Sequence, residues 1–200
     1  MPKANLLLAA LLAAGGTPLH AQMEYHARLG AVWANDLVRD FIFDEITVRQ
    51  SIAPMLALGA TLPVGPRGYR AGLEGTLASG KFHSREAGDD IDLGTLRTAT
   101  LQLGLEGPFS TALRWRAGVG GIKYLPSDDE GIFLEGGPIR FLVGASVDYR
   151  RAVMPRWDLM LSLGYDFHRF STDELEHRGF AQSQGVSRVA FTVGLSRRPQ

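Results

Sequence analysis

The chain has 200 residues, with 21 basic and 21 acidic side chains, so its formal net charge is zero. This balance argues against a uniformly basic nucleic-acid-binding protein and an acidic disordered chain, and we expect no nucleic acid among the partners. Because cysteine is absent, disulfides, thiolate metal sites and thiol nucleophiles are excluded, whereas glycine is unusually frequent with 24 residues.

Residues 1–21 have the composition of a secretory signal peptide. Lys3 supplies the positive start, and Leu6–Ala14 is an apolar stretch that two glycines follow, with a small residue, Ala21, at the predicted cleavage position. That stretch is too short for a membrane-spanning helix, and a mean hydropathy of -0.02 argues against a helical membrane protein. We therefore predict an exported protein with one domain, residues 22–200.

From residue 23 onward, apolar and polar residues alternate with the period of a β-strand. Within 157–168, for example, Leu159 and Leu161 share one face while Asp158 and Ser162 share the other. Eight segments show this pattern, at 23–34, 47–62, 69–83, 95–106, 112–124, 139–150, 157–168 and 186–196. Tight turns alternate with longer loops, which lie near 35–45, 84–94, 125–138 and 170–184. The pattern predicts an all-β fold, an eight-stranded antiparallel up-and-down β-barrel with all four loops at one end.

The remaining question is which face of the strands points inward. A soluble barrel buries its apolar face, whereas a transmembrane barrel turns that face to lipid. The polar face carries mid-strand glycines such as Gly30, Gly104 and Gly118, which fit the crowded interior of a narrow barrel. On the apolar face, aromatic residues gather near both strand ends: Tyr25, Tyr69, Trp115, Tyr149 and Trp157 toward the turns, and Trp33, Phe82, Phe141, Tyr165 and Phe167 toward the loops. These two girdles favour a transmembrane β-barrel over a soluble barrel or sandwich.

With this architecture and its closing strand RVAFTVGLS (Arg188–Ser196), the chain resembles the eight-stranded outer-membrane β-barrel families. These include the OmpA transmembrane domain, the OmpX/Ail group and the opacity proteins. The resemblance implies a bacterial outer-membrane location with extracellular loops, periplasmic termini and short turns, and contact with lipid, lipopolysaccharide and the barrel assembly machinery. Such chains commonly end in an aromatic residue, whereas this one ends in Arg197–Gln200, so we expect an assembly signal around Phe191. We expect a monomer.

Catalytic residues are not evident. Small barrels of this kind include lipid-A deacylases, whose chemistry needs a serine, a histidine and a carboxylate together. The nearest set is His168, Ser171 and Glu174, but His168 and Ser171 are three residues apart and face opposite sides of an extended strand. We predict no catalytic site, no cofactor and no metal site, so the chain is expected not to be an enzyme. A lipid-A-modifying enzyme is kept as an alternative.

Charged residues on the polar face are expected to pair inside the barrel, because an unpaired charge in a narrow interior would be costly. Their heights along the strands predict three groups: Arg28 with Glu74, Arg114 and Arg116 with Asp148, and Asp166 with Arg140 and Arg188. We hypothesise that these pairs, with Met55 and Met160, plug the interior. The alternative is a narrow solute pore.

The outer surface offers two further features. Lys81, Arg97 and Lys123 fall on the apolar face near the loop end, where they are candidate contacts for lipopolysaccharide phosphates or, alternatively, rim charges that reach loop carboxylates. The four loops carry 15 of the 21 acidic residues against three bases, Arg39, Arg85 and Arg178. We therefore expect a structural or surface-interaction role, either envelope integrity or adhesion through acidic extracellular loops.

Overall fold

The computed structural model describes residues 22–41, 45–65, 67–86, 89–128, 131–133, 137–177 and 183–199. The predicted signal segment 1–21 lies outside these residues. Where the structure describes the chain, no helix is both long and apolar enough to cross a membrane. Short helices in the described connections include η2 (Gly131–Phe133) and α2 (Asp173–His177).

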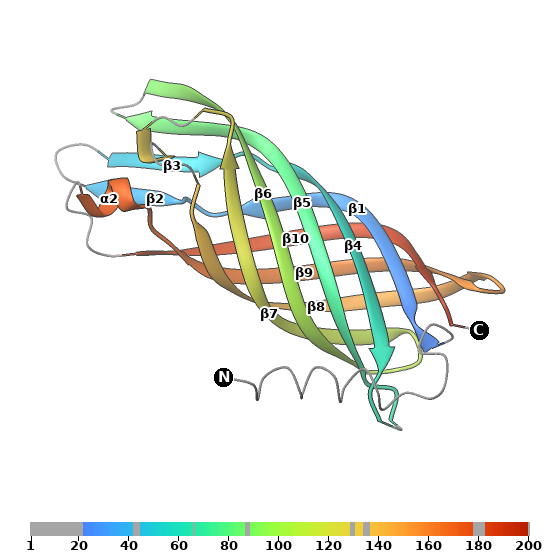
Figure 1. The fold of residues 1–200 in the computed structure, drawn as a ribbon. Helices are drawn as coiled ribbons and strands as arrows, with labels where there is room; N and C mark the ends of the chain where they lie inside the picture. The colour runs from blue at the N-terminus through green and yellow to red at the C-terminus, as the bar shows by residue number, and fades with distance from the viewer. Residues whose placement is uncertain are drawn as a thin grey trace, which may run out of the picture.

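The described residues form one antiparallel sheet that closes on itself (Figure 1). Its strands are β1 (Glu24–Ala34), β2 (Val38–Phe41), β3 (Glu45–Gln50), β4 (Ala53–Pro63), β5 (Arg70–Glu86), β6 (Asp89–Pro108), β7 (Leu113–Pro126), β8 (Ile139–Met154), β9 (Trp157–Phe170) and β10 (Gln184–Arg197). β1 pairs with both β4 and β10, so β1 and β4 to β10 make an eight-stranded wall. β2 and β3 form a hairpin that continues β1 and β4 at the loop end. The prediction of an eight-stranded antiparallel barrel is confirmed.

The pairing register shows how strongly the strands are staggered. A line of directly paired residues runs from Ala34 through Arg188, Asp166, Gly144, Gly118, Gly104, Gly72 and Thr61 to Glu24. It therefore returns to β1 ten residues lower, as expected for strands that tilt around a closed barrel. Four neighbouring strands contribute a glycine to this line. A Cβ at Gly104 would lie 2.9 Å from a backbone oxygen of β7, so glycine lets the inner wall curve tightly there.

Exposure decides which face of the wall is inside. Leu29 and Leu103 on the outside are 66% and 65% exposed, whereas Arg28 and Asp148 on the inside are 4% and 0% exposed. An apolar face turned outward and charges turned inward is the arrangement of a barrel that lipid surrounds. The alternation therefore has the inverted order predicted from the glycines and the aromatic girdles.

Two details of the prediction were wrong. Segment 84–94, predicted as a loop, is mostly strand, because β5 and β6 keep pairing with each other as far as Glu86 and Asp89. The predicted loop 35–45 likewise contains β2 and the start of β3. Phe82, predicted in the outer girdle, shares the inward face of Glu74 and is only 4% exposed. It is buried because it packs against Phe133, with ring centroids 5.6 Å apart.

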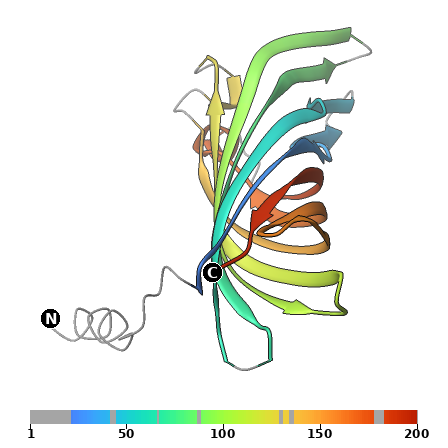
Figure 2. The same ribbon diagram turned by 90° about the vertical axis from the view of Figure 1, so that its right-hand side faces the viewer.

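The β5–β6 hairpin rises above the loop end (Figures 1 and 2). We call its upper part, residues 83–86 and 89–93, the projection. In the described part of the chain, β7 pairs with β6 only from Leu96 downward, so no strand covers the side of the projection that faces away from β5. On its other side the projection is joined to the sheet, because β3 pairs with residues 83–86 of β5; its uncovered edge is that of β6.

Candidate functional site

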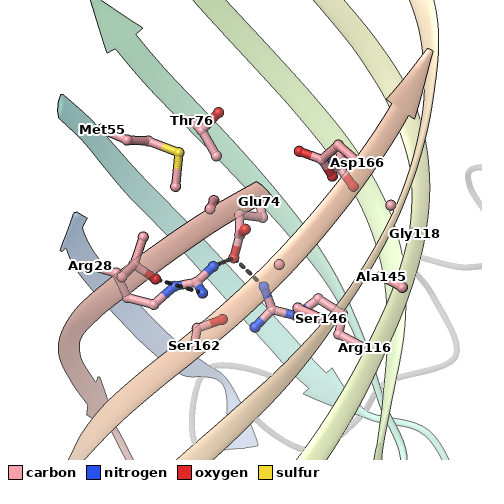
Figure 3. Close-up of a pocket in the computed structure, with 15 residues that line it drawn as sticks. Arg28, Met55, Glu74, Thr76, Arg116, Gly118, Ala145, Ser146, Ser162 and Asp166 are labelled. Atoms are coloured by element: carbon pink, nitrogen blue, oxygen red, sulfur yellow. Dashed lines mark hydrogen bonds and ion pairs between the residues drawn. The ribbon is translucent and has the colours of Figure 1, made fainter. Parts of the chain in front are cut away.

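The centre of the interior is an ionic network around Glu74 on β5. His26 Nε2 lies 2.7 Å from Glu74 Oε2, and the guanidinium groups of Arg28 on β1 and Arg116 on β7 both donate to the same carboxylate. Figure 3 shows these two arginines pointing toward Glu74 from different strands. Arg116 also bonds Asp148 Oδ2 on β8 at 3.1 Å. The predicted partners Arg28 and Glu74, and Arg116 and Asp148, are thus brought together across the interior.

A second ionic layer lies nearer the turn end. Arg150 donates to Glu24 and, at 3.1 Å, to Glu106 Oε2, while Ser196 Oγ donates to Glu24 Oε1 at 2.5 Å. Arg70 Nε lies 3.5 Å from Glu24 Oε2. These residues were not in the predicted set, although they share the inward parity of Arg28 and Asp148. We refer to both layers together as the charged network, which consists of Glu24, His26, Arg28, Arg70, Glu74, Glu106, Arg114, Arg116, Asp148 and Arg150.

The structure corrects the predicted partner of Arg114. Its backbone is directly opposite Asp148 in the register, but its Nε lies 3.4 Å from Glu106 Oε1, and its Nη2 donates to the carbonyl of Gly68 at 2.7 Å. Asp148 is already occupied by Arg116 and by Ser162, whose Oγ donates to Asp148 Oδ1 at 2.5 Å. The side chain of Arg114 therefore turns toward the short turns.

The third predicted group, around Asp166, does not form as predicted. Asp166 Oδ1 accepts from Gln102 Nε2 at 3.1 Å, and no ion pair of Asp166 occurs among the described residues. Arg188 is opposite Asp166 in the register, but its Nη2 donates to Thr98 Oγ1 at 3.3 Å. Arg140 Nε donates to the backbone carbonyl of Ser171 at 3.0 Å, so its hydrogen-bond partner is a connection after β9 instead of the carboxylate of Asp166.

Asp166 borders a small cavity at mid-height in the barrel (Figure 3). The cavity has a volume of about 50 Å³, and its lining includes Arg28, Met55, Gln102 and Asp166. This volume holds a few water molecules, since one water needs roughly 10–15 Å³ of such space. The charged network lies directly below it. The interior at mid-height therefore holds a small polar chamber above the charged network.

Above the chamber lies a cluster of buried apolar side chains. Buried side chains from the strands and from η2 and α2 pack together here, and we call them the apolar cap: Leu37, Val38, Val48, Phe82, Leu96, Ile122, Tyr124, Phe133, Leu142, Phe170, Leu175 and Val186. The rings of Tyr124 and Phe170 are 5.0 Å apart. Because Phe133 and Leu175 come from the connections between strands, those connections turn inward and close the barrel mouth.

The candidate catalytic residues are not brought together. His168 Nε2 lies 2.6 Å from Tyr124 Oη at the base of the apolar cap, while Ser171 Oγ donates to Glu176 Oε1 at 2.9 Å. The side chain of Glu174 lies outside the described residues. Among the described residues no three His, Asp or Glu side chains are grouped so as to hold a metal ion.

The candidate lipid-contacting cations are all on the wall at the loop end. Lys81 and Arg97 are exposed on the outward face of β5 and β6, and Lys123 on β7 is half-buried. Lys123 Nζ donates to the carbonyl of Gly137 at 2.5 Å. Among the described residues, the partner of Lys123 is thus a backbone oxygen.

The sequence matches no family model and no curated protein. Its fold does resemble those of solved structures. Neisserial surface protein A is 12% identical, with a TM-score of 0.58 and coverage of 88% of this chain and 97% of that one. The outer membrane protein AlkL, solved in lipid bilayers, is 11% identical, with a TM-score of 0.56 and coverage of 92% and 93%. OprG of Pseudomonas aeruginosa is 12% identical, with a TM-score of 0.49 and coverage of 89% and 96%. The first two likenesses show that this chain has the fold of an outer-membrane β-barrel.

Proposed function

We propose, on the basis of this fold, that the protein lies in the bacterial outer membrane with its loop end outside the cell and its short turns in the periplasm. Barrels of this class have short periplasmic turns and longer extracellular connections. The same asymmetry is present here, since Pro63 and Arg70 are joined by a short turn while β5 and β6 form the projection at the other end.

The role we propose is structural or adhesive, without catalysis or transport, and one observation carries it. The interior is closed twice, by the apolar cap at the loop end and by the charged network at the turn end. A solute would have to displace buried aromatic rings and then separate ion pairs held by several strands. The surface left for function is the loop end.

The projection gives that surface an acidic patch. Asp89, Asp90 and Asp92 are exposed on the projection, where they stand clear of the wall. An acidic patch attracts basic partners and speeds their encounter. The partner we propose is therefore a basic surface, such as a cationic segment of a host or neighbouring-cell protein.

Adhesion of intact cells tests this role. Cells that produce the protein should bind a polylysine-coated surface better than cells that produce the triple variant D89N/D90N/D92N, which should lose several-fold in bound cells. The control is D158N at the turn end, which removes a carboxylate from the opposite side of the membrane. Equal adhesion by all three strains at matched surface abundance contradicts the proposal.

The pore alternative makes a different prediction for the purified protein. We expect planar bilayers containing it to show no large, steady single-channel steps, because both closures of the interior must open at once. Single-channel recording measures this directly. Regular steps of one amplitude would favour a narrow pore over the closed barrel.

A further inference from the structure

The outward face of the wall carries charge of only one sign. Below the projection, every charged side chain on that face in the described strands is basic: Lys81, Arg97, Lys123, Arg151, Arg169 and Arg197. The carboxylates whose side chains the structure describes lie inside the barrel, on the projection or in the connections. A lipid that approaches the wall therefore meets only cations, and it meets three of them on neighbouring strands.

The register places those three in a row. Lys81 is directly opposite Thr95, two residues from Arg97, and Lys123 is directly opposite Ala99, two residues from Arg97 on its other side. Each cation is thus a diagonal cross-strand neighbour of the next, at a spacing of roughly 7–8 Å. We call Lys81, Arg97 and Lys123 the cation row; it is about 15 Å long on this spacing.

Strand tilt brings the row close to one depth in the membrane. The line of directly paired residues drops ten residues toward the turn end over the eight strands. A line at constant depth in the membrane must therefore step about one residue per strand toward the loop end, from β7 to β6 to β5, relative to direct pairing. The cation row steps two residues per strand in the same direction, so it stays close to constant depth. The three charges therefore face one narrow band of the bilayer rather than a range of depths.

That band is the interface at the loop end. The diagonal that contains the cation row continues to Phe141, since Lys123 pairs with Ile139 and Gly121 pairs with Phe141. It continues again to Phe167, which pairs with Val143. Exposed aromatic side chains in a barrel form girdles at the depth of the headgroups. On β5, β6 and β7 the girdle is replaced by cations, which are at the depth where phosphates lie.

Short side chains separate the cations on the outward face. Ser79 is opposite Arg97, Thr95 is opposite Lys81, and Ala99 is opposite Lys123. These small side chains leave space on the outer surface between the long basic side chains, so a bulky headgroup can approach the strands there. The bond from Lys123 to Gly137 uses one of three ammonium donors and holds that side chain in place.

We propose that the cation row binds the headgroup of a lipid that carries two phosphate groups, with the acyl chains lying against the leucines of the wall below. A row of three cations about 15 Å long matches two separated phosphates better than the single phosphate of an ordinary phospholipid. The proposal rests on the membrane location proposed above. It does not rest on the adhesive role of the projection.

Binding to purified full-length protein in detergent tests the proposal without reference to orientation in a cell. The probe is diphosphoryl lipid A, with monophosphoryl lipid A and phosphatidylcholine as comparisons, and native mass spectrometry counts bound lipids. We expect the triple variant K81Q/R97Q/K123Q to bind diphosphoryl lipid A at least tenfold more weakly than the unmodified protein. Inorganic phosphate in excess should not compete, because the acyl chains contribute to binding.

The matched control is R151Q/R169Q/R197Q, which removes three outward-facing cations that do not form a row. This variant should bind diphosphoryl lipid A as the unmodified protein does. Unchanged binding by K81Q/R97Q/K123Q, or equal losses in both triple variants, would overturn the proposal. Equal affinity for the monophosphoryl and diphosphoryl lipids would overturn the two-phosphate recognition. Gel mobility before and after boiling confirms that each variant is folded.

Discussion

Replacing Glu74 by glutamine should destabilise the folded barrel by about 3–5 kcal/mol, the range measured when one partner of a buried ion pair is removed. Glu74 is the shared partner of Arg28 and Arg116 and lies 2.7 Å from His26 Nε2. Glutamine fits the same space, but it leaves two guanidinium groups without their common countercharge. Urea unfolding in detergent micelles, followed by tryptophan fluorescence, measures the change.

The control for this substitution is Asp89→Asn, which makes the same carboxylate-to-amide change at an exposed position of the projection. Surface charges contribute little to stability, so we expect its unfolding midpoint to match that of the unmodified protein. Equal stability of E74Q and D89N would show that the charged network does not hold the barrel together.

Replacing Phe170 by alanine should cost a similar amount, about 3–5 kcal/mol, through the cavity left in the apolar cap. Phe170 is 1% exposed and contacts the rings of both Tyr124 and Phe133. Because Phe133 belongs to a connection, the loss should also loosen the closure of the mouth. Urea unfolding gives the stability, and limited proteolysis of the folded protein reports the loosened connection.

Phe109→Ala provides the matched control, since Phe109 is 65% exposed in the turn between β6 and β7. The same atoms are removed there without leaving a cavity, so little change is expected in either measurement. A Phe170→Ala protein with unchanged stability and protease resistance would mean that the apolar cap does not seal the barrel.

The barrel and its inside-out polarity follow from features that are local in the sequence. Period-two alternation, the spacing of turns and the glycines on the polar face predict the eight strands and the inward direction of Arg28, Glu74, Arg116 and Asp148. A strand fixes on which face a residue lies, so parity alone places these side chains in one interior. Their contacts then follow from the need of buried charges for partners.

What the sequence did not predict depends on the direction of long side chains and on connections that fold back. Arg114 is opposite Asp148, yet it reaches Glu106, because an arginine side chain extends far enough to choose between neighbours along the barrel axis. The apolar cap is built partly by Phe133, whose position in a connection carries no periodic signal. Phe82 then faces inward because there is an apolar surface inside for it to meet.

Because the two faces of the wall have opposite polarity, the membrane also disfavours strands that pair in a shifted register during assembly. A slip of one residue in β7 would turn Arg114 and Arg116 outward and carry Ala117 and Val119 into the charged interior. An arginine that faces lipid costs up to about 2–4 kcal/mol at mid-membrane and less toward the interface, and the same slip places apolar side chains among buried charges, so both faces of the strand disfavour it. The buried charges therefore raise the free energy of shifted registers, including those that the turns would allow.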